Sequence, residues 1–340
     1  MIQIVPLELG YYDAYYALVQ STPWGNPMLP MQYNSSLWGM VLLDDGAVVG
    51  GWVGTLRGDK RLVRLLAKSV YFDSYPVFAT TEVENGYADK LLDAVRDYAH
   101  ASKVIMLNLT HWVRGNGLMV DTLSKEATFC TALHDMTTEQ LWQQVESKQR
   151  NCIRKGEKSG VEVVVCRGEE SLQYLSEYQA LRQATQQHAI HQHAQASMLL
   201  KSDAFFAEKF RDPKATLFVA KVEGQVAAVA LMLYAGGTVY YYSGGSKYDL
   251  NRKYCCSAFL LWKAICYYNE LGADCFDMGG VPVKPTAAHP AYGVYAFKRS
   301  FGGEYKEFDG GTIIISSRRY RLLQWALSQR KLLRLFSSKL

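Results

Sequence analysis

The sequence predicts an α/β (α+β) protein with two similar halves, in each of which helices flank a mixed β-sheet. Three observations lead to this prediction. The chain has 340 residues, beyond the size at which one hydrophobic core keeps growing. Periods typical of strands and of helices alternate along it. The order of elements in residues 1–135 is also close to the order that begins at Val161.

In the first half we expect the order β-α-β-β-β-α-β. The clearest signal is Asp44-Asp45-Gly46, a strong turn sequence between two apolar strands. Leu91 and Val95 recur at helical spacing and predict a helix after the hairpin. The expected strands are Ile2–Val5, Trp38–Leu43, Ala47–Leu56, Leu62–Tyr71 and Lys103–Leu109, and the expected helices are Tyr11–Val19 and Asn85–Ser102.

A helix over Thr138–Glu157, capped by Thr137 or Thr138, is expected to lead into the second half. The expected strands there are Val161–Cys166, Leu217–Val222, Gln225–Tyr234, Thr238–Ser243 and Asp274–Asp277, and the expected helices are Glu170–Ala184, Asp203–Phe210 and Cys256–Glu270. We therefore expect domains at 1–137 and 161–317, joined by a connecting helix and basic turn at 138–160 and followed by a basic amphipathic helix at 318–340.

Composition excludes little. The net charge of +5 gives no general signal for nucleic-acid binding. The seven cysteines show no C-x-x-C spacing, which favours a reducing compartment. The N-terminal MIQIVPLELGYYDAYY lacks a basic region followed by an apolar run, so we expect no signal peptide and a cytoplasmic protein. The spacing of His188, His191 and His193 fits no common zinc pattern, so no metal site is expected.

The stretch Phe276–Gly303, FDMGGVPVKPTAAHPAYGVYAFKRSFGG, is where we expect the functional site. It begins as the end of a buried strand and opens into a loop rich in proline and glycine. Gly279 and Gly280 let the backbone approach a ligand without an intervening Cβ. The loop returns two cations, Lys298 and Arg299, among aromatic residues. Loops presented by a rigid sheet often carry function.

Three segments, in order, resemble the Fem family of peptidoglycan-bridge aminoacyltransferases. Arg150–Val161 is similar to the family's R-N-x-I-R-K-A-x-K-x-G-V entry into its second domain. Tyr240–Leu271 is similar to its Y-x-x-G-A-S strand and following helix. Phe276–Gly303 is similar to its D-x-G-G strand end and F-K-x-x-F-G segment. The resemblance covers about half of the chain, mostly the second domain.

This resemblance implies tandem GNAT-like acyltransferase domains. It also implies transfer of an aminoacyl group from aminoacyl-tRNA to an amine of a nucleotide- or lipid-linked peptidoglycan precursor, without a bound cofactor. One alternative is a GNAT enzyme that uses acetyl-CoA or another acyl-CoA to acylate a sugar or lipid amine. Such an enzyme presents a loop of sequence R/Q-x-x-G-x-G/A to the pyrophosphate of coenzyme A. At the corresponding place this chain has Arg252–Ala258, RKYCCSA. A non-catalytic module of envelope biogenesis is the third hypothesis.

Candidate roles follow from residue chemistry and from the matched segments. Lys298 lies in the F-K segment, and the resemblance places it close to the reacting ester, where a fixed cation stabilises an oxyanion. Asp277 is a candidate to accept or orient the proton of the amine, or only to cap a turn. The remaining candidates are Tyr241, Tyr242 and Tyr254 for substrate contact, with Tyr242 favoured; Arg150, Arg154, Lys155 and Arg182 for phosphate; Arg299 for phosphate or surface; and Gly279 and Gly280 for close backbone approach.

The C-terminal segment 318–340 carries seven Lys or Arg residues and no acid, interleaved with leucines, Trp325 and Phe336. A basic amphipathic helix with aromatic residues is typical of a membrane-surface element. Packing on the protein body and contact with RNA are the alternatives. A peripheral membrane contact would suit a lipid-linked acceptor at the inner face of the membrane.

Overall fold

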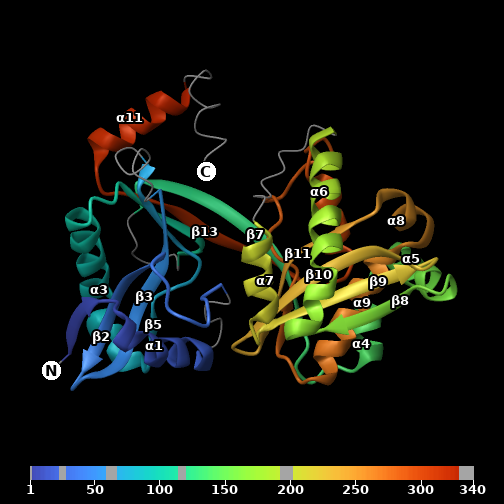
Figure 1. Ribbon diagram of the computed structural model, residues 1–340, viewed down its shortest axis with the longest axis horizontal. Coiled ribbons are helices and arrows are strands. Elements are labelled where there is room, and N and C mark those ends of the chain that lie inside the picture. The colour runs from blue at the N-terminus through green and yellow to red at the C-terminus, as the bar shows by residue number, and fades with distance from the viewer. Residues whose placement is uncertain (1, 23–27, 59–66, 114–119, 192–201, 329–340) are drawn as a thin grey trace. The chain divides into compact units, whose positions relative to one another are not determined.

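The computed structural model describes residues 2–22, 28–58, 67–113, 120–191 and 202–328 (Figure 1). The chain divides into two compact units, which are described separately. Unit 1 comprises Met1–Lys125 and Phe308–Leu340, and unit 2 comprises Glu126–Glu307. The mixed α/β class predicted from the sequence is confirmed in both.

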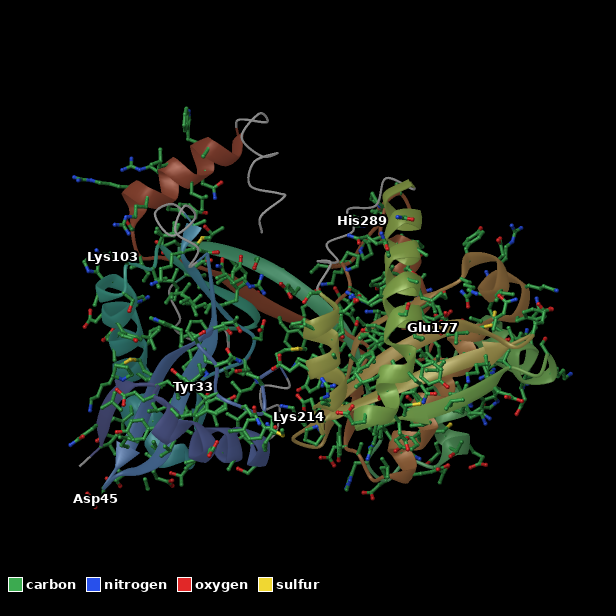
Figure 2. All side chains as sticks on the ribbon, in the orientation of Figure 1. Tyr33, Asp45, Lys103, Glu177, Lys214 and His289 are labelled. Carbon is green, nitrogen blue, oxygen red and sulfur yellow. The ribbon has the colours of Figure 1, made fainter. Side chains whose placement is uncertain are left out.

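Unit 1 has a mixed sheet in the order β1-β2-β3-β4-β6-β13, with β5 paired to β3. Neighbours are antiparallel except β4 and β6. The predicted hairpin is confirmed, with Asp45 at its tip (Figure 2) in the left-handed region that such turns favour. Its elements are β1 Gln3–Pro6, α1 Leu9–Ser21, β2 Leu37–Asp44, β3 Ala47–Arg57, β4 Ser69–Phe72, β5 Val77–Phe78, α3 Thr81–Ala101, β6 Met106–Val113, β13 Glu304–Ile314 and α11 Ser317–Ser328. Part of the predicted strand Leu62–Tyr71 lies outside the described residues.

Unit 2 has a sheet in the order β8-β9-β10-β11-β12-β7, antiparallel except between β11 and β12. In Figure 1, α6 crosses the front of this sheet and α9 lies behind it. Its elements are β7 Thr122–Ala132, α4 Thr138–Gln144, α5 Ser147–Lys158, β8 Glu162–Cys166, η1 Gly168–Tyr174, α6 Leu175–His191, α7 Asp203–Arg211, β9 Ala215–Val222, β10 Gln225–Ala235, β11 Thr238–Ser246, α8 Tyr248–Tyr254, α9 Cys256–Glu270, β12 Cys275–Asp277 and α10 Tyr292–Arg299.

The two sheets repeat one topology, as the order of elements predicted. In each sheet the first four strands pair antiparallel with one another, and the fourth and fifth strands pair parallel. The sixth strand pairs antiparallel with the fifth. The sixth strands are exchanged. β7 follows β6 in the chain but pairs with β12, and β13 follows β12 but pairs with β6.

This exchange moves the domain limits away from the linear boundaries expected at 137 and 317. Residues 126–137 fall in unit 2 because β7 pairs with β12 there, and residues 308–317 fall in unit 1 because β13 pairs with β6. A sequence read in order carries no signal for strands that pair outside their own repeat.

The single helix predicted over Thr138–Glu157 is wrong, because the chain breaks between α4 and α5. Val145 is buried and extended at the break. The guanidinium of Arg150 donates to the carbonyls of Trp142, Gln143 and Val145, which satisfies the end of α4. The N–H of Glu146 donates to the carbonyl of Ser300 at 2.8 Å. These bonds replace the helical bonds that a continuous helix would make.

The stretch expected to be loop up to Gly303 also contains a helix, α10. Pro290 stands just before it, and Gly302 and Gly303 follow with φ of +84° and +89°. A proline near the start and a glycine after the end are helix-boundary signals that could have predicted it. Phe297 in α10 packs on Phe301, with ring centroids 5.3 Å apart. Lys298 lies on the last turn of this helix.

Candidate functional site

The candidate site of unit 2 is built around Lys298. Its ammonium donates to the carbonyl of Gly280 at 3.1 Å and lies 5.5 Å from the centroid of the Tyr241 ring. The side chain is half-buried. Burial lowers its pKa from 10.5 to about 8, although the nearby charge of Asp277 acts in the opposite direction. Lys298 is therefore a cation at neutral pH that gives up its proton readily.

Asp277, at the end of β12, is buried and holds the turn that follows. Its Oδ1 accepts hydrogen bonds from the hydroxyl of Thr128 and from the N–H of Gly279, the latter at 2.7 Å. The carboxylate thereby fixes the Gly279-Gly280 turn whose carbonyl receives Lys298. This arrangement gives Asp277 a positioning role, in line with the turn-capping alternative.

Gly279 and Gly280 differ in whether the fold around them could accept a Cβ. Gly279 has φ of +71°, and a Cβ there would stand 2.7 Å from the carbonyl oxygen of Tyr241. Around Gly280, a Cβ would meet nothing within 4 Å among the described residues. Gly279 is needed by the fold, whereas the open space at Gly280 leaves room for a ligand to approach the backbone.

Thr128 is a site residue that the sequence did not reveal. It lies on β7, is buried, and contacts both Asp277 and the carbonyl of Gly279, the latter at 3.0 Å. It reaches the site through the exchanged strand, 149 residues away from Asp277 in sequence. No motif of the sequence marked it.

Of the three neighbouring tyrosines on β11, Tyr241 is the one whose ring lies beside Lys298. Burial raises the pKa of its hydroxyl to about 12. The sequence favoured Tyr242, which is half-buried and falls at a register shift: Ser243 pairs with Leu231, but Tyr241 pairs with Met232. Such a bulge redirects side chains and is common near active sites. The substrate role of Tyr242 stays a prediction.

Several predicted site residues are held by other groups of the protein. The Tyr254 hydroxyl donates to Glu223, which also pairs with Lys253 at 3.2 Å. Arg299 pairs with Glu146 at 3.0 Å. Arg150 caps α4. The structure brings none of these three to Lys298 through a hydrogen bond or ion pair between described residues.

Arg182, on α6, is 4% exposed. Its guanidinium lies 4.4 Å from the Phe206 ring centroid and 5.5 Å from that of Tyr178, and its Nη1 donates to Gln179 at 3.2 Å. Its Nε has no hydrogen-bond partner among the described residues. A buried donor left in this way retains capacity for an anion.

Arg154 and Lys155 remain exposed on α5. Arg154 donates to Asn151 at 3.3 Å and lies 5.3 Å from the Trp142 ring centroid. Both cations are accessible to a phosphate backbone.

The residues at the start of α9, where a GNAT enzyme would hold the pyrophosphate of coenzyme A, do not fit that group. The N–H of Ser257 is already taken by the side-chain oxygen of Asn251 at 2.8 Å. Cys255 adopts a left-handed φ of +56°, and Cys255 and Ser257 occupy the positions of the glycines that would let phosphate approach.

No described residues form a cluster that could hold a metal ion, and the side chains of His188, His191 and His193 lie outside the described part of the chain. The helices within the described ranges fall short of the length and apolarity that crossing a bilayer requires.

The chain is similar to several known proteins. Residues 144–299 match the acetyltransferase (GNAT) domain family. Over 103 residues, the chain is 32% identical to lipid II:glycine glycyltransferase of Staphylococcus epidermidis; this part makes up 30% of the chain and only 22% of that relative. The fold is similar to that of FemX, with a TM-score of 0.70 and 17% identity over 95% of this chain and all of that one. It is also similar to L-PGS from Bacillus licheniformis, with a TM-score of 0.53 and 14% identity over 86% and 87% of the two chains. At these identities, the two structural similarities concern the fold.

Proposed function

We propose that this chain, a Fem-like member of the GNAT acyltransferase superfamily, moves an aminoacyl group from aminoacyl-tRNA to an amine of a peptidoglycan precursor. The observation that carries the proposal is the placement of Lys298. A half-buried cation is held at the end of β12 by the Gly280 carbonyl, beside Tyr241 and the turn that Asp277 fixes.

The chemistry asked of this site is aminolysis of an ester. The amine nitrogen forms a bond to the ester carbonyl carbon, and negative charge develops on the carbonyl oxygen. The bond from that carbon to the ribose oxygen of the tRNA then breaks, the amine nitrogen loses one proton, and the ribose oxygen takes up one proton to leave as a hydroxyl. Lys298 would stabilise the developing oxyanion, which is the largest single contribution in most acyl transfers. Asp277 and Thr128 would act through position, by keeping the Gly280 carbonyl and hence the ammonium in place.

The cations suggest how two phosphate-bearing substrates are held. Arg182 has a buried donor to spare, which suits the diphosphate of a nucleotide- or lipid-linked precursor. Arg154 and Lys155 are exposed and suit the backbone of tRNA. The name of the Staphylococcus epidermidis relative supports a lipid-linked acceptor. We place the reaction in the cytoplasm, at the inner face of the membrane when the precursor is lipid-linked.

The two competing functions have less support. An acyl-CoA donor would need the start of α9 to receive a pyrophosphate, and Asn251 occupies one of the amides there. The non-catalytic module is disfavoured because Lys298, which the matched F-K segment places near the reacting ester, is retained and held by the Gly280 carbonyl.

The experiment that tests the proposal combines the purified protein with charged tRNA and a peptidoglycan precursor, followed by mass spectrometry of the precursor. We expect a mass increase of one aminoacyl residue that requires the charged tRNA. Release of free thiol from acetyl-CoA with the same acceptor and without tRNA would establish the acyl-CoA alternative instead. No product with either donor would favour the non-catalytic module.

A further inference from the structure

The C-terminal helix of unit 1, α11, has two different faces. Leu323 and Ala326 are buried, at 8% and 7% exposure. Near its start, the guanidinium of Arg319 donates to the carbonyl of Lys103 at 3.3 Å. In Figure 2, Lys103 is labelled at the upper end of α3, below α11. One face of the helix therefore packs on the protein, which was one alternative left open by the sequence.

The other face carries Arg318, Arg321, Leu322 and Trp325, all exposed. Leu322 is 46% and Trp325 is 59% exposed. The spacing of these positions, 318, 321, 322 and 325, places them on one side of an α-helix. Along this face the two arginines come first and the exposed leucine and tryptophan follow, so the surface is cationic toward the start of the helix and apolar further along it.

The charge of the surrounding sequence indicates which partner binds this face of α11. No aspartate or glutamate occurs after Asp309, whereas the segment 318–340 carries seven arginines and lysines. Anionic lipid headgroups complement this charge, and the headgroup boundary accepts Leu and Trp side chains beside cations. RNA would engage the arginines but offers an exposed leucine much less.

We propose that the exposed face of α11, defined by Arg318, Arg321, Leu322 and Trp325, docks on an anionic membrane surface. The helix lies in the plane of the interface: Leu322 and Trp325 enter the headgroup boundary and the arginines remain at the phosphates. This inference rests on the proposed function and names the surface by which the protein would reach the membrane. Binding to vesicles requires neither tRNA nor turnover, so its failure and the failure of the proposed function are distinguishable.

The test is co-sedimentation of the full chain with vesicles of phosphatidylcholine, with and without phosphatidylglycerol. We expect binding that needs phosphatidylglycerol and weakens with salt. The double variant Leu322→Ser/Trp325→Ser should bind on the order of tenfold more weakly. Arg318→Gln/Arg321→Gln should lose at least about fivefold. Leu271→Ser is the matched control, because Leu271 is 50% exposed but lies in unit 2; it should bind as the wild type does.

A second readout locates the contact. Brominated lipids quench tryptophan that enters a bilayer, so they should quench the wild type and quench Trp325→Phe much less, although this variant keeps an apolar side chain and should still sediment. Equal sedimentation of Leu322→Ser/Trp325→Ser and the wild type would overturn the proposal. So would arginine variants that lose affinity for tRNA while their vesicle binding is unchanged, since that result assigns the face to RNA.

Discussion

The ammonium of Lys298 donates a hydrogen bond to the main-chain carbonyl of Gly280, 18 residues earlier in the chain, at 3.1 Å. This bond joins the last turn of α10 to the turn that leaves β12. The carbonyl is held in turn by Asp277, which accepts the N–H of Gly279 at 2.7 Å. A mobile lysine loses much of its electrostatic effect to reorganisation, whereas a fixed one is oriented before the reaction begins.

Replacing Lys298 with alanine should lower kcat/KM by on the order of 10²- to 10³-fold, because a preoriented donor to the oxyanion is lost. The Tm should change little, because the side chain is half-buried and pairs with a single carbonyl. Lys263→Ala is the control: Lys263 is an exposed lysine on a helix of the same unit. A large loss of Tm in Lys298→Ala with a proportionate loss of activity would make Lys298 a structural residue.

The pH dependence of kcat/KM should show a falling limb near the Lys298 pKa of about 8. Below this pH the side chain of Lys298 is a cation, and above this pH it loses its positive charge. Lys298→Arg keeps its charge throughout and should lack the limb. Since the folded-state pKa lies below the ordinary 10.5, the unfolded chain binds more protons between these values. The stability contributed by this group therefore rises with pH over that window, and in Lys298→Met this rise should be absent.

Asp277→Asn should move the falling limb of the kcat/KM pH profile to lower pH. The charge of Asp277 raises the pKa of Lys298 against the effect of burial, so removing the charge leaves burial unopposed. An asparagine can still present Oδ1 to the N–H of Gly279, which keeps the turn. A limb that stays in place would show that the Asp277 charge does not act on Lys298, and kcat/KM measured over the full pH range decides between the two outcomes.

Gly279 and Gly280 should respond differently to alanine. Gly279→Ala forces a left-handed conformation that costs roughly 1–2 kcal/mol, with a Cβ 2.7 Å from the Tyr241 carbonyl oxygen. Thermal unfolding should show a Tm lower by several degrees. Gly280→Ala should leave the Tm near that of the wild type, because a Cβ there meets no described atom within 4 Å. An increase in KM for Gly280→Ala alone would place substrate at this backbone; equal Tm losses in the two variants would contradict the distinction.

Much of the fold could be predicted from the sequence, because local patterns encode most of it. Asp45 and Gly46 mark a hairpin, and Leu91, Val95 and their neighbours mark α3. The exchange of β7 and β13 could not be predicted, because it depends on which of two similar sheets each strand joins. The break at Val145 depends on long-range contacts, including the bond from the N–H of Glu146 to the carbonyl of Ser300.

The site residues that lie in one segment of the sequence could be predicted. Those that come from distant segments could not. Lys298, Asp277 and the two glycines lie in one stretch, and the structure brings them together. Thr128 enters from the exchanged strand and had no signal. The ring of Tyr241, and not the favoured Tyr242, lies beside Lys298, and no signal in the sequence distinguished these two neighbours.

Arg150, Arg154 and Lys155 lie within six residues of one another but should separate into two functions. Arg154 and Lys155 are exposed, so Arg154→Gln/Lys155→Gln should weaken tRNA binding and flatten its dependence on salt by roughly 0.7 per lost phosphate contact. Arg150 donates to three carbonyls at the end of α4, so Arg150→Ala should cost about 1–3 kcal/mol of stability. Its affinity for tRNA should stay close to that of the wild type. Filter binding over a salt series, together with thermal unfolding, measures both effects. If Arg150→Ala instead loses tRNA affinity at unchanged stability, its guanidinium leaves the helix end to bind phosphate, and the capping bonds describe only the free protein.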